Sequence, residues 1–499
     1  MRAPGAILIL TLAACATAAL ADFRATETVL CRRHPAGILR EPIVSPDWRH
    51  VAELASRDAK RVVALDGKEH ADAWDEIDVL SIRFSPDSAR LAYTARRGVE
   101  WFLVLDGKVA AGPFAKVDQD TFAFSPDSKR YAVNIRRAGR CRYLIDGVET
   151  AAFEHPTPFR RYFSPDSRRL GYFYFAKEEG YAVVDGAKLG PFANVVESFP
   201  CFSPDSTRVA FAVIEAPDRY RLIVDGQPQP VTFAGVGSLS PQFSPDSKRL
   251  AYSVRTKDGR LALVVDGQQG EAYENLTGNF FFSPDSRRIA YGAYFGDRKA
   301  AIVDGVRGTL FARISTFQFS PDSGRVAVLG QLDTGRWTWE VDGVASPVFD
   351  HPGDLRFSPD SRRFAFPLQR GRHYFLRTDD GAEAGPYTAV SNQVRYSADS
   401  KRLAWIALNG AKGLVVVDGV EHPVYDRVTG SLHFSPDGRH VGYTAEDAGK
   451  ALLVVDGKPA SPPVDRFLPD HQLFFTAPKA CHTLARRGDD YVILALRYE

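Results

Sequence analysis

The sequence predicts an all-β protein built from about twelve copies of a four-stranded unit. Two short phrases carry this prediction: FSPDS, or a near copy, returns about every 39 residues, and VDG follows each copy after 21 or 22 residues. A third observation is that no unit contains a helical apolar period of useful length. Self-similarity at a fixed period of this size is the signature of a repeat architecture.

The two phrases mark paired units along most of the chain. The first serine of the FSPDS phrase stands at Ser45, Ser85, Ser125, Ser164, Ser203, Ser244, Ser283, Ser320, Ser358, Ser397 and Ser435. The aspartates of the second phrase are Asp66, Asp106, Asp146, Asp185, Asp225, Asp266, Asp304, Asp342, Asp380, Asp418 and Asp456. We expect a degenerate twelfth unit at the end, where residues 475–478 replace FSPD and residues 491–494 replace the strand before VDG.

Within one unit, short apolar runs are separated by turn residues, which is typical of strands. In the second unit the expected strands, A to D, cover residues 79–84, 90–94, 101–105 and 112–114. Ser-Pro-Asp-Ser between A and B predicts a tight turn, because proline presets φ and the polar side chains bond nearby amides. Asp-Gly between C and D predicts a two-residue hairpin, since a type I′ turn needs positive φ at both central residues.

Four strands in about 40 residues is the size of one blade of a β-propeller. The segment FSPDSKRLAY, from Phe243 to Tyr252, and its sister copies resemble the WD40-like (PD40) propeller repeat of TolB-like periplasmic proteins. The resemblance covers nearly the whole mature chain and implies a propeller in an exported bacterial protein. The chain lacks the α/β domain of the Tol-system protein and has about twice its number of blades, so that protein's partners are not carried over.

The spacing between units changes near residues 267–282. From each VDG aspartate to the next SPD serine there are 18 or 19 residues before this point and 16 or 17 after it. We therefore expect two six-bladed propellers in tandem, over residues 22–274 and 275–499. A split into seven and five blades is one alternative. Another is that a strand near residues 28–31 completes the last blade, which a Cys31–Cys481 disulfide would favour and which would place both chain ends in one ring.

Residues 1–21 are expected to be a signal peptide. Arg2 gives a positive start, and the apolar run over residues 6–20 is too short to span a membrane. Cleavage is expected after Ala21, and the alternative is a lipoprotein, since Cys15 and the residues before it resemble a lipobox. No later stretch is long and apolar enough to span a bilayer. The expected location is the periplasm or the extracellular space.

The overall charge points to no nucleic-acid partner. The 63 basic and 61 acidic side chains nearly cancel, leaving a formal net charge of +2, so any charge specialisation must be local. Four cysteines remain after the signal peptide. Cys141 and Cys201 lie in units that are not adjacent, so we expect both to be small buried residues rather than a disulfide.

In a propeller, the A–B and C–D turns share one face, and the B–C loops and D–A linkers share the other. The repeated phrases therefore occupy one face and the variable segments the opposite one, where binding residues concentrate in such scaffolds. Several B–C loops are basic, which favours an acidic protein or an envelope glycan as partner; the plainer interpretation is a solvated surface. The candidate binding residues are Arg96, Arg97, Arg136, Arg137, Arg140, Arg255, Lys257, Arg260, Arg370 and Arg372.

Most units place an arginine three residues after the SPD aspartate. A ring of arginines could gather an anion, but the accompanying aspartates and the repetition in unit after unit favour local pairing that stabilises each turn. The pairs predicted to be structural are Asp87 with Arg90, Asp127 with Arg130, and Asp246 with Arg249.

The sequence contains no motif that points to catalysis. The histidines lack HExxH or paired metal spacing, no G-x-S-x-G elbow occurs, and each SPD turn offers one carboxylate where calcium needs about six oxygens. We therefore expect no catalytic residue, metal or cofactor. The expected function is a non-enzymatic exported scaffold that binds a protein or cell-envelope component through variable loops. The alternative is a propeller enzyme that acts on a polysaccharide or peptide at the channel mouth.

Overall fold

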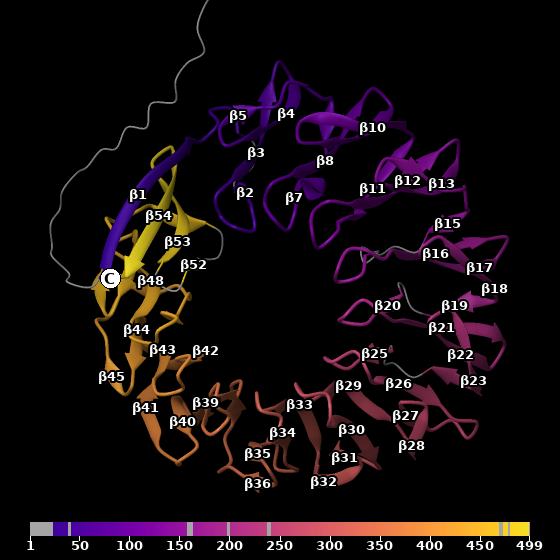
Figure 1. Ribbon diagram of the computed structural model, residues 1–499. Coiled ribbons are helices and arrows are strands. Elements are labelled where there is room, and N and C mark those ends of the chain that lie inside the picture. Colours follow the sequence, from indigo (N-terminus) through magenta and orange to yellow (C-terminus); the bar gives the residue numbers. More distant parts are fainter. Residues whose placement is uncertain are drawn as a thin grey trace, which may run out of the picture.

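The chain forms one ring of twelve antiparallel sheets in its computed structural model (Figure 1). The structure describes residues 23–37, 41–156, 163–196, 200–236, 241–468, 473–477 and 480–498. Each sheet, or blade, has four strand positions from the inner strand A to the outer strand D, and an interrupted strand A counts as two short strands. The predicted β-propeller with twelve four-stranded blades is confirmed.

The strands of the first six blades follow in the order A to D. Blade 1 contains β2 (Ile43–Val44), β3 (Val51–Arg57), β4 (Lys60–Leu65) and β5 (Lys68–Glu69). Blade 2 contains β6 (Glu76–Ile77) with β7 (Arg83–Phe84), β8 (Leu91–Arg97), β9 (Glu100–Leu105) and β10 (Lys108–Phe114). Blade 3 contains β11 (Lys116–Phe124), β12 (Tyr131–Arg137), β13 (Arg140–Ile145) and β14 (Val148–Glu149). Blade 4 contains β15 (His155–Pro156), β16 (Gly171–Ala176), β17 (Glu179–Val184) and β18 (Ala187–Phe192). Blade 5 contains β19 (Asn194–Val195) with β20 (Cys201–Phe202), β21 (Val209–Ala216), β22 (Arg219–Val224) and β23 (Gln227–Phe233). Blade 6 contains β24 (Gly235–Val236) with β25 (Gln242–Phe243), β26 (Leu250–Arg255), β27 (Leu261–Val265) and β28 (Gln268–Tyr273).

The second half repeats this order. Blade 7 contains β29 (Leu276–Phe282), β30 (Ile289–Phe295), β31 (Arg298–Val303) and β32 (Val306–Phe311). Blade 8 contains β33 (Arg313–Phe319), β34 (Val326–Gln331), β35 (Trp337–Val341) and β36 (Val344–Ala345). Blade 9 contains β37 (His351–Pro352) with β38 (Arg356–Phe357), β39 (Phe364–Arg370), β40 (His373–Thr378) and β41 (Glu383–Tyr387). Blade 10 contains β42 (Ala389–Tyr396), β43 (Leu403–Asn409), β44 (Lys412–Val417) and β45 (Val420–Glu421). Blade 11 contains β46 (Arg427–Val428) with β47 (His433–Phe434), β48 (Val441–Asp447), β49 (Lys450–Val455) and β50 (Lys458–Pro459). Blade 12 contains β51 (Arg466–Leu468) with β52 (Phe474–Ala477), β53 (Ala480–Arg487), β54 (Asp490–Tyr498) and β1 (Phe23–Arg32). Among the described residues, the helical structure is one 3-10 turn, η1 (Val79–Ser81), before β7.

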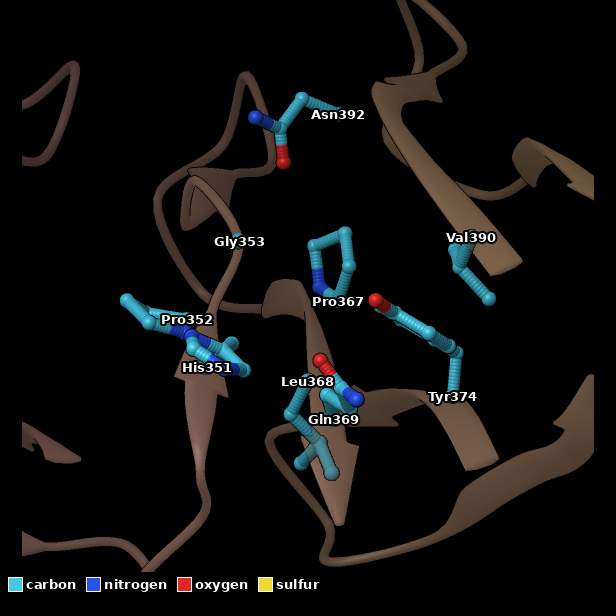
Figure 2. Close-up of a pocket in the computed structure, with 9 residues that line it drawn as sticks. All are labelled: His351, Pro352, Gly353, Pro367, Leu368, Gln369, Tyr374, Val390 and Asn392. Atoms are coloured by element: carbon cyan, nitrogen blue, oxygen red, sulfur yellow. The ribbon is translucent and has the colours of Figure 1, made fainter. Parts of the chain in front are cut away.

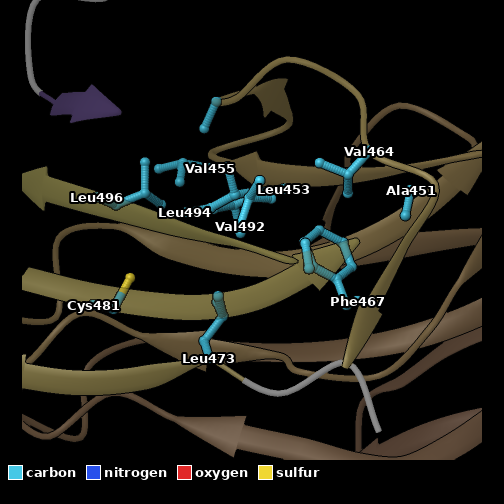
Figure 3. Close-up of a cluster of buried hydrophobic side chains, with 12 residues drawn as sticks. Ala451, Leu453, Val455, Val464, Phe467, Leu473, Cys481, Val492, Leu494 and Leu496 are labelled. Carbon is cyan, nitrogen blue, oxygen red and sulfur yellow. The ribbon is translucent and has the colours of Figure 1, made fainter. Parts of the chain in front are cut away.

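Strand B of each blade is apolar on both faces because both faces are covered by neighbouring blades. Residues 91–95 of β8 are all buried, although their side chains alternate between the two faces of the sheet. Consecutive blades therefore share a hydrophobic cluster at each interface. Figure 3 shows the cluster between blades 11 and 12, where Leu453 and Val455 of β49 face Leu494 and Leu496 of β54.

The ring is closed by the first strand of the chain. β1 pairs antiparallel with β54, from Phe23 opposite Tyr498 to Arg32 opposite Asp490, and forms the outer strand of blade 12. Figure 1 shows this strand, in indigo, beside β54, in yellow. Blade 12 also packs against blade 1, where Trp48 and Val51 share a buried cluster with Leu484. The alternative in which the strand near residues 28–31 completes the last blade is the one that the structure contains.

The expected pair of six-bladed rings is wrong, because the twelve blades share one ring. At the expected boundary between residues 274 and 275, only Glu274 and Asn275 separate β28 from β29. Tyr273 and Leu276, on either side of them, lie in one hydrophobic cluster between blades 6 and 7. The change in spacing near residues 267–282 thus belongs to an ordinary blade-to-blade connection. The alternative split into seven and five blades is wrong as well, because all twelve blades belong to one ring.

The chain ends meet without a disulfide. Cys31 and Cys481 both belong to blade 12, and neither forms a disulfide. Cys481 lies in the cluster that faces blade 11 (Figure 3), whereas Cys31 packs against the cluster that faces blade 1. The two thiols therefore sit on opposite faces of one sheet. Cys141 is buried as predicted, whereas Cys201 is half-buried, and neither forms a disulfide.

The proposed signal peptide over residues 1–21, including Cys15, lies outside the described residues. Among the described residues, no helix has the length and apolar character needed to cross a membrane.

Candidate functional site

The SPDS turn is held by its own side chains in each repeat. In blade 2, Ser85 Oγ donates to Asp87 Oδ1 at 2.6 Å and accepts from the amide of Arg90 at 3.0 Å. Asp87 Oδ1 also accepts from the amide of Ala89 at 3.0 Å. These bonds stabilise the ionised carboxylate, so the Ser85 hydroxyl and the Ala89 amide hold the pKa of Asp87 below its usual value.

Each SPDS turn also contacts the next blade. The amide of Asp87 donates to Ser128 Oγ in blade 3 at 2.9 Å, and Asp127 and Asp246 make the same bond to Ser167 and Ser286. The accepting serine is the last residue of the next SPDS phrase and has a positive φ, 65° for Ser128. In blade 11 its place is taken by Gly438, with a φ of 72°. The repeated phrase thus joins blades as well as strands.

In eight of the described blades the arginine after the turn binds the aspartate of VDG rather than that of SPD. Arg90 Nε donates to Asp106 Oδ2 at 3.1 Å, and Arg130 and Arg249 bind Asp146 and Asp266 at 2.8 Å. This corrects the predicted pairs, because strands B and C bring the two turns side by side on one face. The same pairing occurs in Arg169–Asp185, Arg208–Asp225, Arg288–Asp304, Arg325–Asp342 and Arg402–Asp418.

The guanidinium groups also lie over the aromatic ring of the following blade. Arg249 is 5.4 Å from the centroid of the Phe282 ring, and it donates to the carbonyl oxygens of Ser286 and Arg287 at 3.1 and 2.7 Å. Stacking on an aromatic face and a fork of donors are both properties of arginine. The charges and donors of this face are therefore used within the ring, which leaves little of the turn face free to bind a partner.

The opposite face has a repeated contact that the sequence reasoning missed. An acidic or hydroxyl side chain at the start of a blade accepts a hydrogen bond from a backbone amide of the B–C turn. Examples are Asp75 with Gly98 at 2.6 Å, Asp350 with Gly371 at 2.6 Å and Asp465 with Gly488 at 2.6 Å. The signal was present in the sequence, because the acceptor stands 21 to 23 residues before the capped amide in these blades.

Most of the ten candidate basic residues on this face already have partners. Ion pairs join Arg96 to Glu76, Arg97 to Asp72, Arg137 to Glu149, Arg140 to Glu154, Arg260 to Asp258 and Arg370 to Glu383. Arg136 contacts Cys141 Sγ at 3.9 Å, and Arg255 donates to the carbonyl oxygen of Gly259 at 2.8 Å. Lys257 and Arg372 are exposed. The ten residues come from blades 2, 3, 6 and 9, so the structure does not bring them together as one patch.

A pocket of about 420 Å3 lies between blades 9 and 10, toward the linker face. Figure 2 shows Tyr374 and Val390 on one side of it, His351 and Pro352 on the other, and Asn392 above. Its lining consists of His351, Pro352, Gly353, Pro367, Leu368, Gln369, Tyr374, Val390 and Asn392. Apolar walls with a few polar groups are typical of binding pockets.

The pocket forms where the repeat is interrupted. Pro367 lies inside β39, where proline has no amide to donate, and it lies beside the gap between β37 and β38, a gap that strand A also has in blades 2, 5, 6, 11 and 12. Gly353 bridges the break, because its amide donates to the carbonyl oxygen of Pro367 at 2.8 Å. A Cβ at Gly353 would lie 2.7 Å from Pro367 Cβ and 2.8 Å from Asn392 Oδ1, so the close approach needs glycine. This site was not predicted from the sequence, although Pro367 within a strand was a usable signal.

The side chains that line the pocket are suited to binding a ligand through hydrogen bonds and apolar contacts. Its lining includes one imidazole, one phenol and two amide side chains, with no carboxylate, amine or thiol among the residues described there. In the described ranges, no group of three or more His, Cys, Asp or Glu side chains is placed to hold a metal ion.

Comparison with known proteins finds no matching family model and no matching curated protein. The chain is similar to a solved structure described as a eukaryotic initiation factor, with 14% identity and a TM-score of 0.34 over 64% of this chain and 90% of the other. It is similar to the tricorn protease, with 11% identity and a TM-score of 0.27 over 90% of this chain and 60% of the other. It is also similar to the β-propeller domain of the Trilobed protease from Pyrococcus furiosus, with 15% identity and a TM-score of 0.26 over 53% of this chain and 93% of the other.

With TM-scores this low, none of these likenesses bears on what the chain binds. Its length corresponds to less than two thirds of the tricorn protease chain. The resemblance to TolB-like repeats stays a prediction.

Proposed function

We propose that the chain is an exported, non-enzymatic scaffold that binds a protein or cell-envelope component on its linker face. The observation that carries the proposal is the pocket between blades 9 and 10, where Pro367 and Gly353 break a repeat that the turn face preserves. Loops and irregular segments on a rigid scaffold are where binding residues concentrate. None of the ten candidate basic residues is among the described residues that line this pocket.

The contrast between the two faces supports this choice. On the turn face, serine, aspartate and arginine side chains are engaged with one another from blade to blade. In the pocket, His351 is exposed and Tyr374 is half-buried, so both are accessible to a ligand. The described lining residues offer an imidazole and a phenol but no carboxylate, amine or thiol to act as a nucleophile or to orient the imidazole, so no observation favours the enzyme alternative.

Export is part of the proposal. The N-terminal segment has the composition of a signal peptide, and β1 begins at Phe23, two residues after the expected cleavage site. Determining the N-terminal residue of the protein recovered from the periplasm or medium tests this step. Asp22 as the first residue supports cleavage after Ala21, a lipidated Cys15 supports the lipoprotein alternative, and an uncleaved chain in the cytoplasm contradicts export.

The binding role is tested by affinity capture from envelope extract with the full chain as bait. The variant His351→Ala combined with Tyr374→Phe removes two polar groups of the pocket while leaving most of the packing intact. The matched control is His155→Ala, because His155 and Pro156 of β15 hold the same place in blade 4 as His351 and Pro352 in blade 9. We expect a specific partner that the wild type and the control retain and the pocket variant releases. Failure of the wild type to retain any partner would contradict the proposal.

A further inference from the structure

Three side chains of cationic type hold one position in three consecutive blades. Arg356, Arg395 and His433 each stand immediately before the aromatic residue that opens the SPD turn, on β38, β42 and β47. At this position the other described blades carry Ile43, Arg83, Ala123, Cys201, Gln242, Phe281 and Gln318. Arg356, Arg395 and His433 therefore form a row that is particular to blades 9 to 11, and the repeat itself does not require a basic residue at this position.

The three groups are close enough to influence one another. Burial lowers the pKa of Arg395, and repulsion from Arg356 lowers it further. Burial also lowers the pKa of His433, with repulsion from Arg395 as the second cause. Positive groups that are partly withdrawn from water and face one another gain stability when an anion joins them.

The row has donors available to such an anion. Arg356 Nε is buried and has no hydrogen-bond partner among the described residues. The carboxylate of Asp354 approaches Arg356 Nη2 at 3.6 Å, which is longer than a hydrogen bond. Arg395 Nη1 donates to the carbonyl oxygen of Val394 at 3.2 Å. One carboxylate at this distance leaves the two guanidinium groups with an excess of positive charge.

The pocket and the row lie along the same inner strands, β37 with β38 in blade 9 and β42 in blade 10. We call this boundary between the two blades the seam. Gly353 stands three residues before Arg356 in blade 9, and Asn392 stands three residues before Arg395 in blade 10. Three residues of strand span about 10 Å. Asn392 Oδ1 also accepts from the amide of Asp354 at 3.1 Å, so the two inner strands are joined between the pocket and the row.

We propose that this seam binds an acidic peptide, with an apolar side chain in the pocket and a carboxylate between Arg356 and Arg395. The inference deepens the proposed scaffold function and rests on it. Guanidinium groups bind carboxylates with paired, charge-assisted hydrogen bonds. The walls formed by Pro352, Pro367 and Val390 suit an apolar side chain better than the hydroxyl groups of a sugar.

Fluorescence anisotropy with labelled peptides tests the inference on the full chain at low salt. The probe is an octapeptide that alternates leucine and glutamate, and the comparison peptide has glutamine in place of glutamate. We expect the glutamate peptide to bind at least about tenfold more tightly, because one charge-assisted contact of this kind is worth about that factor. Arg395→Gln and Arg356→Gln should each abolish the preference, and Arg395→Lys should retain part of it.

The control variant is Arg372→Gln, which removes an exposed basic residue of the nearby loop. It should keep the full preference, and a thermal melt of each variant excludes unfolding as the cause of any loss. Equal binding of the two peptides by the wild type, no binding of either, an equal loss in Arg372→Gln, or tighter binding of oligogalacturonate than of the glutamate peptide would each overturn the inference.

Affinity capture separates this inference from the proposed function. A partner retained equally by the wild type and by the Arg356→Gln, Arg395→Gln double variant would overturn the acidic-peptide site and leave the scaffold role standing. Release of that partner by the double variant supports both.

Discussion

The phenolic hydroxyl of Tyr491 donates a 2.9 Å hydrogen bond to Oε1 of Glu53 across the junction between blade 12 and blade 1. The other carboxylate oxygen of Glu53 accepts from the amide of His34 at 2.9 Å. Glu53 is 3% exposed, and a buried carboxylate is costly unless such bonds satisfy it. Burial and the nearby Glu53 raise the pKa of Tyr491, which keeps the phenol protonated and able to donate. Glu53 of blade 1 therefore links His34, in the segment after β1, with Tyr491 of blade 12.

Tyr491→Phe should weaken the closure of the ring. The change leaves the buried carboxylate of Glu53 with one donor fewer, which costs about 1–3 kcal/mol. Urea unfolding followed by tryptophan fluorescence measures the loss. Tyr396→Phe is the matched control, since the Tyr396 hydroxyl is buried without a hydrogen-bond partner among the described residues and most other repeats carry phenylalanine there. The control should be neutral or stabilising, and an equal loss in both variants would contradict the role given to Glu53.

Replacing the last serine of an SPDS phrase should separate the effect of a lost hydrogen bond from the effect of a positive φ. Ser128→Ala removes the acceptor for the amide of Asp87 and keeps the positive φ of 65°, so we expect a loss of about 1–2 kcal/mol. Ser128→Gly loses the same bond but adopts positive φ freely, so its loss should be about 1 kcal/mol smaller. Urea unfolding of both variants gives the order. A glycine variant less stable than the alanine variant would contradict this account. Gly438 in blade 11 is a natural example of glycine at this position with positive φ.

Arg249→Lys should destabilise the protein nearly as much as Arg249→Ala. The lysine keeps the charge near Asp266 but loses the stacking on Phe282 and the geometry that reaches two carbonyl oxygens of the next blade. We expect each variant to lose about 1–3 kcal/mol in urea unfolding. Arg372→Ala, in an exposed loop, is the control and should change stability by less than about 0.5 kcal/mol. Full stability in Arg249→Lys would show that the charge alone suffices.

Acid should destabilise the ring between pH 4 and pH 2. The hydroxyl of Ser203 and the amide of Thr207 lower the pKa of Asp205 to about 2. The hydroxyl of Ser244 and the amide of Lys248 also lower the pKa of Asp246. An aspartate in the unfolded chain has a pKa of about 3.9. The folded state therefore binds fewer protons, and the stability that these carboxylates contribute above about pH 4 is lost as the pH falls toward 2.

Unfolding midpoints in urea, measured at several pH values, test this dependence. Asp205→Asn should lower stability at neutral pH and make the decline between pH 4 and pH 2 shallower. Asp297→Asn, in an exposed B–C turn, should keep the decline of the wild type. A wild type whose stability is constant over this window would contradict the prediction.

The fold was largely predictable because the repeat specifies local structure. The turn chemistry of Ser-Pro-Asp-Ser and Asp-Gly fixes two hairpins per unit, and apolar strands need cover on both faces. The number of rings was not predictable, because closure depends on pairing between β1 and β54, which lie at opposite ends of the chain. A small change in spacing near residues 267–282 could not distinguish a domain boundary from a shorter connection.

The candidate site was only partly predictable. The choice of the linker face agrees with the position of the pocket, but the basic loops that drew attention are mostly paired with local carboxylates, such as Arg370 with Glu383. Which residues meet across a blade interface depends on three-dimensional packing. Gly353 and Asn392 come from different blades, and only the ring places them at one pocket.

Hydrogen exchange of the full chain, with and without the partner retained from envelope extract, tests the central claim most directly. The claim is that the partner occupies the seam between blades 9 and 10, from the pocket near the linker face to Arg356 and Arg395 beside the SPD turns. We expect slower amide exchange on binding in residues 351–356 and 389–396, with no change in the SPD and VDG turns of blades 2 to 7. Protection confined to those turns, or spread evenly around the ring, would contradict the account.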